Sequence, residues 1–315
     1  MIPKIDAAHC RAEKNTNKGL PEKAKVILSM EQNKCWCGSG LPYVQCHRPA
    51  EIKLAELRAA GERVPDKHMI KSAVQIEGCR KAGAVNTLIL DKVAEKIRAG
   101  MTTQDIDDIV MEETRKAGGT PACLHYEGFP KSVCTSVNHV ICHGIPSNKV
   151  VLREGDIVNV DCTTQYGGYY GDASRMFQIG NVPDAAKRLV RVTKEAVALA
   201  VSHLKPYCHL GDIGFYINRY AREHGYHVVR EIGGHGVGLQ MHEDPYVCHI
   251  GSLGKGMVLC PGMIFTIEPM INEGTSRFYV DPHDCWQIYT ADGKLSAQWE
   301  YEILITETGI EILSH

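Results

Sequence analysis

Apolar residues recur with the period of an amphipathic helix in four segments of the chain. Each segment ends at a residue that disfavours further helix, namely Gly100, Gly118, Pro206 or Gly225. A threonine pair just after Gly100, with Asp105 in the first turn, is typical of a helix start. The predicted helices cover residues 69–99, 102–119, 185–204 and 212–225.

Segments between the helices have the alternation or the short apolar runs of β-strands. Gly167-Gly168 separates two of them, and a glycine pair in this position predicts a two-residue hairpin turn. The predicted strands cover residues 156–165, 169–179, 263–271 and 298–306. This mixture of helices and strands predicts an α+β domain.

Two of the helical segments share one pattern. Asp105-Ile106 precedes Gly118 at the same spacing at which Asp212-Ile213 precedes Gly225, 107 residues further along the chain. The match is short, but it favours two related halves that share one sheet, with a site between them.

The chain divides into four predicted parts. Residues 1–33 are a polar, lysine-rich extension with at most a short helix at 24–30. Residues 34–49 form a small unit with its own chemistry, and residues 50–67 form a charged, helical linker that stops at Pro65. Residues 68–315 carry the pattern described above and form the main domain.

Composition narrows the class of protein. The net charge of −2, with 44% hydrophobic and 23% charged residues, is ordinary for a globular protein and argues against general nucleic-acid binding. Residues 1–67 hold 12 Lys and Arg against 8 Asp and Glu, which hints at a phosphate-rich partner for this end. Thirteen cysteines, with no signal-peptide core and no membrane-spanning run, predict a cytoplasmic protein with reduced thiols and no membrane contact.

Two aspartates flank the predicted hairpin turn. If Tyr166 pairs with Tyr169, Asp161 lies opposite Ser174 and Asp172 opposite Thr163, so that the aspartates are diagonal neighbours on one face. Two like charges in apolar strands are costly unless a cation lies between them. The pair therefore predicts metal ligands rather than a solvated face.

Three further side chains are candidates for the same site. His235 lies among four glycines that permit a close backbone approach, and no Lys or Ser/Thr follows as a phosphate-binding loop requires. Glu268 and Glu300 lie in the two late strands, where each alone is equally well explained as a surface carboxylate. Oxygen-rich ligands of this kind suit two divalent ions such as Mn, Fe or Co.

Two more histidines are candidates for substrate contacts. His242 follows the glycine cluster, and two histidines around such a cluster favour a functional role for both. His143 stands in an apolar segment, where it is either a buried structural histidine or a hydrogen-bond donor to a substrate carbonyl.

Residues 68–315 resemble the type I methionine aminopeptidases. The resemblance rests on short motifs in a fixed order, at residues 136–146, 159–161, 171–174, 233–238, 265–269 and 296–300. It implies the duplicated pita-bread fold of the creatinase/aminopeptidase group. It also implies removal of the initiator methionine from nascent polypeptides whose second residue is small.

The resemblance assigns a role to each candidate. Asp161, Asp172, His235, Glu268 and Glu300 hold two divalent ions, with Asp172 and Glu300 bridging them. Glu268 also moves the proton, while His143 and His242 stabilise the oxyanion and position the peptide. The methionine side chain is expected to lie against apolar and sulfur-containing residues, namely Cys123, Tyr126, Phe129, Cys134, Met241 and Trp286. Phe129 and Met241 replace a more usual tyrosine and phenylalanine, and both keep the wall apolar.

The small unit carries its own ligand pattern. Cys35, Cys37, Cys46 and His47 have the spacing C-x-C-x8-C-H, which predicts a closed structural zinc site that supplies most of the folding energy of residues 34–49. The segment resembles the SEC-C motif found in the bacterial translocation ATPase and on some bacterial methionine aminopeptidases. The resemblance implies a docking module, with the ribosome or the nascent-chain machinery as its partner.

Two other functions are compatible with parts of this pattern. One is an Xaa-Pro aminopeptidase of the same fold, although such enzymes usually carry a large N-terminal domain. The other is a non-catalytic binding protein that works through the zinc unit, although such a protein is expected to have lost metal ligands. All five ligands are present in this chain.

Overall fold

The computed structural model describes residues 33–315. The described residues divide between Pro49 and Ala50 into two compact units, a small one before this point and a large one after it. The short helix expected at 24–30 lies outside the described residues. Among the described residues no helix is long and apolar enough to span a membrane.

The small unit is built from tight turns. Lys34 forms an isolated β-bridge with Pro42, and the 3₁₀-helix η1 spans Tyr43–Gln45. Gly38 and Gly40 have φ values of 78° and 76°, a left-handed conformation that glycine adopts without steric cost. The segment between the bridge partners therefore folds back on itself and returns the chain to η1.

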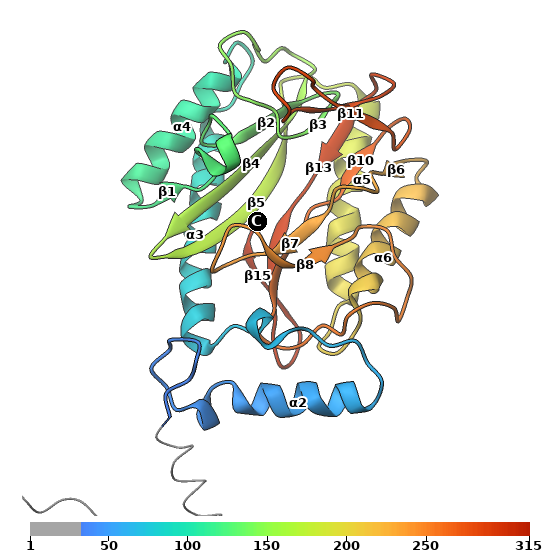
Figure 1. Cartoon of the computed structure of the whole chain (residues 1–315). Helices are drawn as coiled ribbons and strands as arrows, with labels where there is room; N and C mark the ends of the chain where they lie inside the picture. The colour runs from blue at the N-terminus through green and yellow to red at the C-terminus, as the bar shows by residue number, and fades with distance from the viewer. Residues whose placement is uncertain (1–32) are drawn as a thin grey trace, which may run out of the picture. The chain divides into compact units, whose positions relative to one another are not determined.

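The large unit contains most of the secondary structure (Figure 1). Its main helices are α3 Ala73–Lys96, α4 Thr103–Lys116, α5 Asp184–His203 and α6 Leu210–Glu223, with α2 Arg48–Ala59 starting at the unit boundary and 3₁₀-helices η2 Lys67–Met69 and η3 Tyr126–Gly128. Its strands are β1 Thr120–Pro121, β2 Cys134–Val137, β3 Val140–Cys142, β4 Ile157–Tyr166, β5 Tyr169–Gln178, β6 His227–Val228, β7 Gly234–Gly236, β8 Glu243–Val247, β9 Ile264–Ile267, β10 Met270–Asn272, β11 Phe278–Val280, β12 Ile288–Thr290, β13 Ser296–Gln298, β14 Tyr301–Ile305 and β15 Ile310–Ser314.

The four predicted main helices are present, and in α3, α4 and α6 a side chain of the first turn accepts the N–H of the capping residue. Helix α3 starts at Ala73 rather than at residue 69, because Ser72 and Gln75 form a capping box. Residues 50–67, expected as a helical linker, include most of α2, and Leu54 of that helix is buried in the main core.

The structure confirms the internal repeat. Helices α4 and α6 start 107 residues apart, and each has an aspartate at its third position that accepts a hydrogen bond from the capping residue's N–H, Asp105 in one and Asp212 in the other. The isolated bridges Thr102–Val151 and His209–Val258 are separated by the same interval. In Figure 1 the helix pairs α3–α4 and α5–α6 flank the strands on opposite sides. The large unit is thus two related halves around a central set of strands.

Within residues 33–315 the strands form four sheets. One contains β1, β4, β2 and β5, and another has the order β15-β14-β9-β7-β8. Two three-stranded sheets have the orders β13-β10-β6 and β11-β12-β3. Gly171 of β5 packs so closely on α3 that an added Cβ would lie 2.5 Å from the backbone of Ala82. This contact fixes the strand that carries Asp172.

The two late strands differ from the prediction. Each was expected to be continuous, but the first is split into β9 and β10 and the second into β13 and β14. Pro269 has no N–H to donate to a ladder, which accounts for the first break. The pairs Ile267–Tyr301 and Met270–Gln298 keep one register across both breaks, so Glu268 and Glu300 lie opposite each other.

Candidate metal centre and substrate cavity

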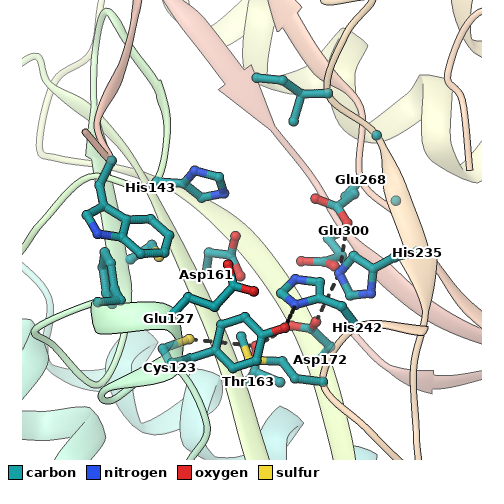
Figure 2. Close-up of a pocket in the computed structure, with 18 of the residues that line it drawn as sticks. Cys123, Glu127, His143, Asp161, Thr163, Asp172, His235, His242, Glu268 and Glu300 are labelled. Carbon is teal, nitrogen blue, oxygen red and sulfur yellow. Dashed lines mark hydrogen bonds and ion pairs between the residues drawn. The ribbon is translucent and has the colours of Figure 1, made fainter. Parts of the chain in front are cut away.

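The β4–β5 hairpin positions the two aspartates as expected. Asp161 pairs with Ser174 and Asp172 pairs with Thr163, in the predicted register. Asp172 is buried, and its Oδ1 accepts a hydrogen bond from Thr163 Oγ1 at 2.9 Å. The hairpin therefore presents both carboxylates to the pocket that Glu268 and Glu300 also line (Figure 2).

Glu268 and Glu300 enter the same space from the broken late strands. Thr266 Oγ1 donates to Glu268 Oε1 at 2.8 Å, and Gln298 Nε2 donates to Glu268 Oε2 at 3.2 Å. Glu300 is buried, and its N–H donates to the carbonyl of Ser174 at 3.1 Å. The absence of ladder pairing at these two residues lets their side chains turn inward.

His235 completes the cluster from β7. Its Nδ1 lies 3.0 Å from the carbonyl of Gly236, which favours the tautomer with the proton on Nδ1. The free Nε2 lies 3.5 Å from Glu268 Oε1 and 3.7 Å from Asp172 Oδ2. The flanking glycines are required sterically, because a Cβ at Gly236 would lie 2.1 Å from the carbonyl oxygen of Asp244.

The cluster gathers four carboxyl groups without a cationic side chain. Carboxylate oxygens of Asp161, Asp172 and Glu300 lie within 4.8 Å of one another. Burial raises the pKa of Asp172 to about 7, and burial followed by the neighbouring carboxylates raises the pKa of Asp161, Glu268 and Glu300 well above the usual range. No Lys or Arg is among the cavity-lining residues of the described chain. Four carboxylates and one imidazole in this arrangement fit a pair of divalent cations.

The cluster forms the floor of a cavity of about 460 Å³. Cys123, Phe129 and Cys134 form a buried apolar group on one side, and Met241 and Trp286 pack against it. The rings of Phe129 and Trp286 meet edge to face, with centroids 5.2 Å apart. All six residues expected to contact a substrate side chain line this cavity, namely Cys123, Tyr126, Phe129, Cys134, Met241 and Trp286.

His143 and His242 lie on the cavity wall (Figure 2). Burial lowers the pKa of each histidine to about 4, and the other nearby imidazoles add to the effect. Both are therefore neutral at neutral pH, and each has one N–H to donate. His242 Nδ1 lies 2.8 Å from the Tyr126 hydroxyl, so a hydrogen bond donated by that hydroxyl leaves the proton of His242 on Nε2.

Several residues around the site were missed by the sequence reasoning. Thr163 and Glu127 line the cavity, and the Nε2 of buried His249 accepts from the Glu268 N–H at 3.1 Å. Glu302 is buried behind the site and accepts the N–H of Asp172 at 2.9 Å. Thr163 and Glu302 each lie two residues after a ligand on the same strand face, so strand alternation could have identified them.

The small unit brings its four candidate ligands together. The ligand atoms of Cys35, Cys37, Cys46 and His47 all lie within 4.8 Å of one another. His47 Nδ1 is 3.2 Å from Cys35 Sγ, and the sulfurs of Cys37 and Cys46 are 3.6 Å apart. A tetrahedral zinc ion with bonds of about 2.3 Å to sulfur separates its ligand atoms by roughly 3.5–3.8 Å. The four side chains thus fit a closed zinc site.

Thiol ionisation within this unit also favours a metal. Burial raises the pKa of Cys37, but hydrogen bonds with Ser39 and the neighbouring thiols outweigh burial and bring the pKa to about 6. Burial raises the pKa of Cys46 to about 11. The Cys37 thiolate is thus available near neutral pH, whereas metal binding must displace the proton of Cys46.

Comparison with known proteins gives one consistent group of relatives. Residues 77–307 match metallopeptidase family M24. The chain is 46% identical over 250 residues to methionine aminopeptidase A of Synechocystis, a match that covers 79% of this chain and 98% of the relative. It is 42% identical over 285 residues to a methionine aminopeptidase of Chlamydia pneumoniae, with 89% and 97% covered. The Chlamydia match leaves 11% of this chain uncovered. That is fewer residues than the 49 that precede the large unit, so the match reaches into the small unit.

Solved structures of methionine aminopeptidases are also similar to this chain, and an X-Pro aminopeptidase differs from them in how much of its length is matched. The methionine aminopeptidase of Rickettsia prowazekii superposes with a TM-score of 0.77 at 41% identity, covering 78% of this chain and 99% of that chain. The X-Pro aminopeptidase of Thermotoga maritima superposes with a TM-score of 0.61 at 25% identity, and the present chain covers only 62% of its length. This chain is therefore similar to methionine aminopeptidases over their full length and to the X-Pro enzyme over a part.

Proposed function

The chain belongs to metallopeptidase family M24, in which it is a methionine aminopeptidase, and from this premise we propose how its cavity performs the reaction. We infer that it removes the N-terminal methionine from nascent polypeptides and peptides whose second residue is small. The observation that carries the proposal is the position of the carboxylate cluster at the floor of a cavity lined by sulfur and aromatic groups.

Five side chains would hold two divalent ions, and manganese, iron and cobalt all suit them. Asp172 and Glu300, whose ligand oxygens lie within 4.8 Å of each other and of that of Asp161, would bridge the ions. Asp161 would complete one site, and His235 with Glu268 the other. When bound, such a pair supplies a hydroxide nucleophile at neutral pH and a ligand position for the free α-amine of the peptide.

Glu268 is placed to move the proton during hydrolysis. Its two oxygens already accept hydrogen bonds from Thr266 and Gln298, which fix the carboxylate in the cavity. It can take a proton from the attacking water and give it to the leaving amine.

His143 and His242 would act as neutral hydrogen-bond donors. Each retains one N–H at neutral pH, and both lie on the cavity wall where the scissile carbonyl must be placed. A donor aimed at the developing oxyanion lowers the barrier more than one aimed at the ground-state carbonyl. The Tyr126 hydroxyl would hold the His242 ring in the required tautomer.

The apolar wall of the cavity would hold the methionine side chain. Cys123, Cys134 and Met241 offer polarisable sulfur, and Phe129 and Trp286 offer ring surfaces in edge-to-face contact. Thioethers make favourable contacts with aromatic rings. The cavity is closed on this side by buried residues, which suits recognition of a chain's first side chain.

Hydrolysis of short peptides tests the proposal. With Mn²⁺ or Co²⁺ added, the protein is expected to release methionine from Met-Ala-Ser and Met-Gly-Ser, to act poorly on Met-Ile-Ser, and to leave N-acetyl-Met-Ala-Ser intact. Cleavage confined to Xaa-Pro peptides would assign the chain to the other activity of this fold. Failure to cleave any of them would favour the non-catalytic alternative.

We propose in addition that the zinc unit docks the enzyme on the ribosome or the nascent-chain machinery in the cytoplasm. Its Trp36 and Leu41 are 39% and 38% exposed, which leaves apolar surface for a partner. Co-sedimentation of the protein with ribosomes, compared with the Cys35→Ser variant, tests this role. Equal binding by both proteins would exclude the zinc unit as the contact.

A further inference from the structure

A buried ion pair lies next to the loop that carries two cavity residues. Lys71 is 4% exposed and directly precedes Ser72, the capping residue of α3. Its ammonium group contacts the Oε2 atom of Glu243, the first residue of β8. A buried lysine is costly unless it is paired, so this contact is a fixed part of the structure.

The second oxygen of Glu243 organises the loop that precedes it. Glu243 Oε1 accepts hydrogen bonds from the N–H groups of Leu239, at 2.6 Å, and Gln240, at 2.8 Å. At the start of the loop, the N–H of Tyr170 donates to the carbonyl of Gly238 at 3.0 Å. The 238–242 loop is therefore held at both ends.

Two residues of the 238–242 loop line the cavity, Met241 and His242. Met241 packs against the apolar wall, and the rings of His242 and His235 have centroids 4.2 Å apart. Figure 2 shows His242 beside His235. A displacement of this loop would thus change both the side-chain pocket and the donor to the carbonyl.

Lys71 itself does not reach the cavity. It is absent from the cavity-lining residues of the described chain, as is Glu243. Its backbone N–H donates to the carbonyl of Gly262 at 2.8 Å, which ties the residue to the loop before β9. Its ion pair with Glu243 links the ammonium group to the loop that carries Met241 and His242.

We propose that Lys71 is a positioning residue for the aminopeptidase reaction, acting through Glu243 on the 238–242 loop. The ammonium group fixes the Glu243 carboxylate, that carboxylate fixes the loop backbone, and the loop places Met241 and His242. The inference rests on the function proposed above, since it assigns an effect on that reaction. It predicts that loss of the ammonium group weakens substrate turnover without removing a ligand of the metal centre.

A double-mutant cycle tests the proposed route. With Mn²⁺ bound, Lys71→Met is expected to lower kcat/KM for Met-Ala-Ser by about tenfold or more, because small displacements of substrate-positioning groups have effects of that size. In the Glu243→Ala background the same substitution should cause no further loss, because the two residues act in series. Effects that multiply in the double variant would contradict a route through Glu243.

Amide hydrogen exchange distinguishes positioning from a purely structural role. In Lys71→Met, the amides of residues 239–242 should exchange faster than in the wild type, while those of α3 and the β4–β5 hairpin keep their protection. The metal content should stay at the wild-type value. Faster exchange throughout the large unit, or loss of metal, would show that Lys71 serves only stability.

Lys96→Met provides the matched control. Lys96 Nζ lies 2.7 Å from Glu113 Oε1 in an ion pair between α3 and α4, and neither residue lines the cavity. This variant should keep kcat/KM within about twofold of the wild type.

The double variant Lys71→Met/Glu243→Ala replaces Lys71→Met if the single variant fails to fold. It leaves no unpaired buried charge, and its amide exchange and kcat/KM are compared with the wild type in the same way. If the wild-type enzyme is active and a Lys71 variant has the same kcat/KM, the role of Lys71 is wrong and the proposed function stands. If the wild-type enzyme is inactive, the proposed function itself is wrong.

Discussion

Glu300 faces Glu268 across the breaks in the late strands, and its oxygens lie near those of both hairpin aspartates. Four carboxylates in so small a volume repel one another strongly when ionised. Their retention in a buried cluster makes sense only if they bind cations. The side chains thus serve the reaction at a cost to the stability of the metal-free fold.

Replacement of Glu300 separates these two effects. Glu300→Ala should lower kcat for Met-Ala-Ser by about 100-fold or more, because it removes a proposed bridging ligand. The melting temperature of the metal-free protein should not fall, because one repelling carboxylate is gone. Steady-state kinetics and thermal unfolding check both results, with the exposed Glu307→Ala as the control. Near-normal turnover in Glu300→Ala would contradict the assigned role.

The pKa of Asp172 predicts how metal affinity depends on pH. Burial raises this pKa to about 7 in the metal-free fold, above its value in the unfolded chain. Protonation therefore stabilises the metal-free fold at low pH, and this contribution is lost as the pH rises through about 7. Cations bind the ionised form, so Mn²⁺ affinity should fall as the pH drops below about 7.

Calorimetric titration and thermal unfolding between about pH 5.5 and 8 test this linkage. The melting temperature of the metal-free protein should decrease with rising pH, while the increase caused by Mn²⁺ should become larger. An Mn²⁺ affinity that does not change over this range would show that Asp172 is not a ligand.

At the scale of single residues, the sequence predicts the positions of side chains that depend on local strand pairing. It does not predict the positions of those that depend on how loops pack. The glycine pair fixes the hairpin register, so the positions of Asp161 and Asp172 follow from spacing alone. His143 has a left-handed φ of 56°, and Glu127, with φ of 48°, lines the cavity. Such conformations are set by tertiary contacts and leave no periodic signal in the sequence.

At the scale of elements, the long helices and the hairpin are predictable because each has a period and a capping or turn signal. The two strand breaks are only partly predictable: Pro269 marks the break between β9 and β10, but Trp299-Glu300, between β13 and β14, carries no such signal. Short strands such as β2 and β7 also escape prediction, since three or four residues are too few to show alternation. Yet the breaks and the short strand β7 are what place Glu268, Glu300 and His235.

The small unit gives a prediction at this scale. Cys35→Ser removes one of four zinc ligands, so zinc should be lost and residues 34–49 should lose their protection from amide exchange. Hydrolysis of Met-Ala-Ser should stay close to the wild-type rate, because none of the cavity residues belongs to that unit. Metal analysis, exchange and kinetics provide the three readouts. Cys208→Ser, outside both sites, is the control, and a parallel fall in turnover would show that the units are coupled.

At the scale of the whole molecule, the internal repeat accounts for the central position of the site. The β4–β5 hairpin of the first half supplies Asp161 and Asp172, and the strands of the second half supply His235, Glu268 and Glu300. Neither half alone holds the full set of ligands. The matching intervals between α4 and α6 and between the two isolated bridges show how far the repeat extends beyond the short motif visible in the sequence.

The most direct test of the account is anomalous diffraction from crystals of the protein grown with Mn²⁺. Data collected at the manganese edge should show two peaks in the cavity, both coordinated by Asp172 and Glu300, one also by Asp161 and the other by His235 and Glu268. No peak among these side chains, or manganese bound by a different set of residues, would contradict the dinuclear centre on which the proposed reaction depends.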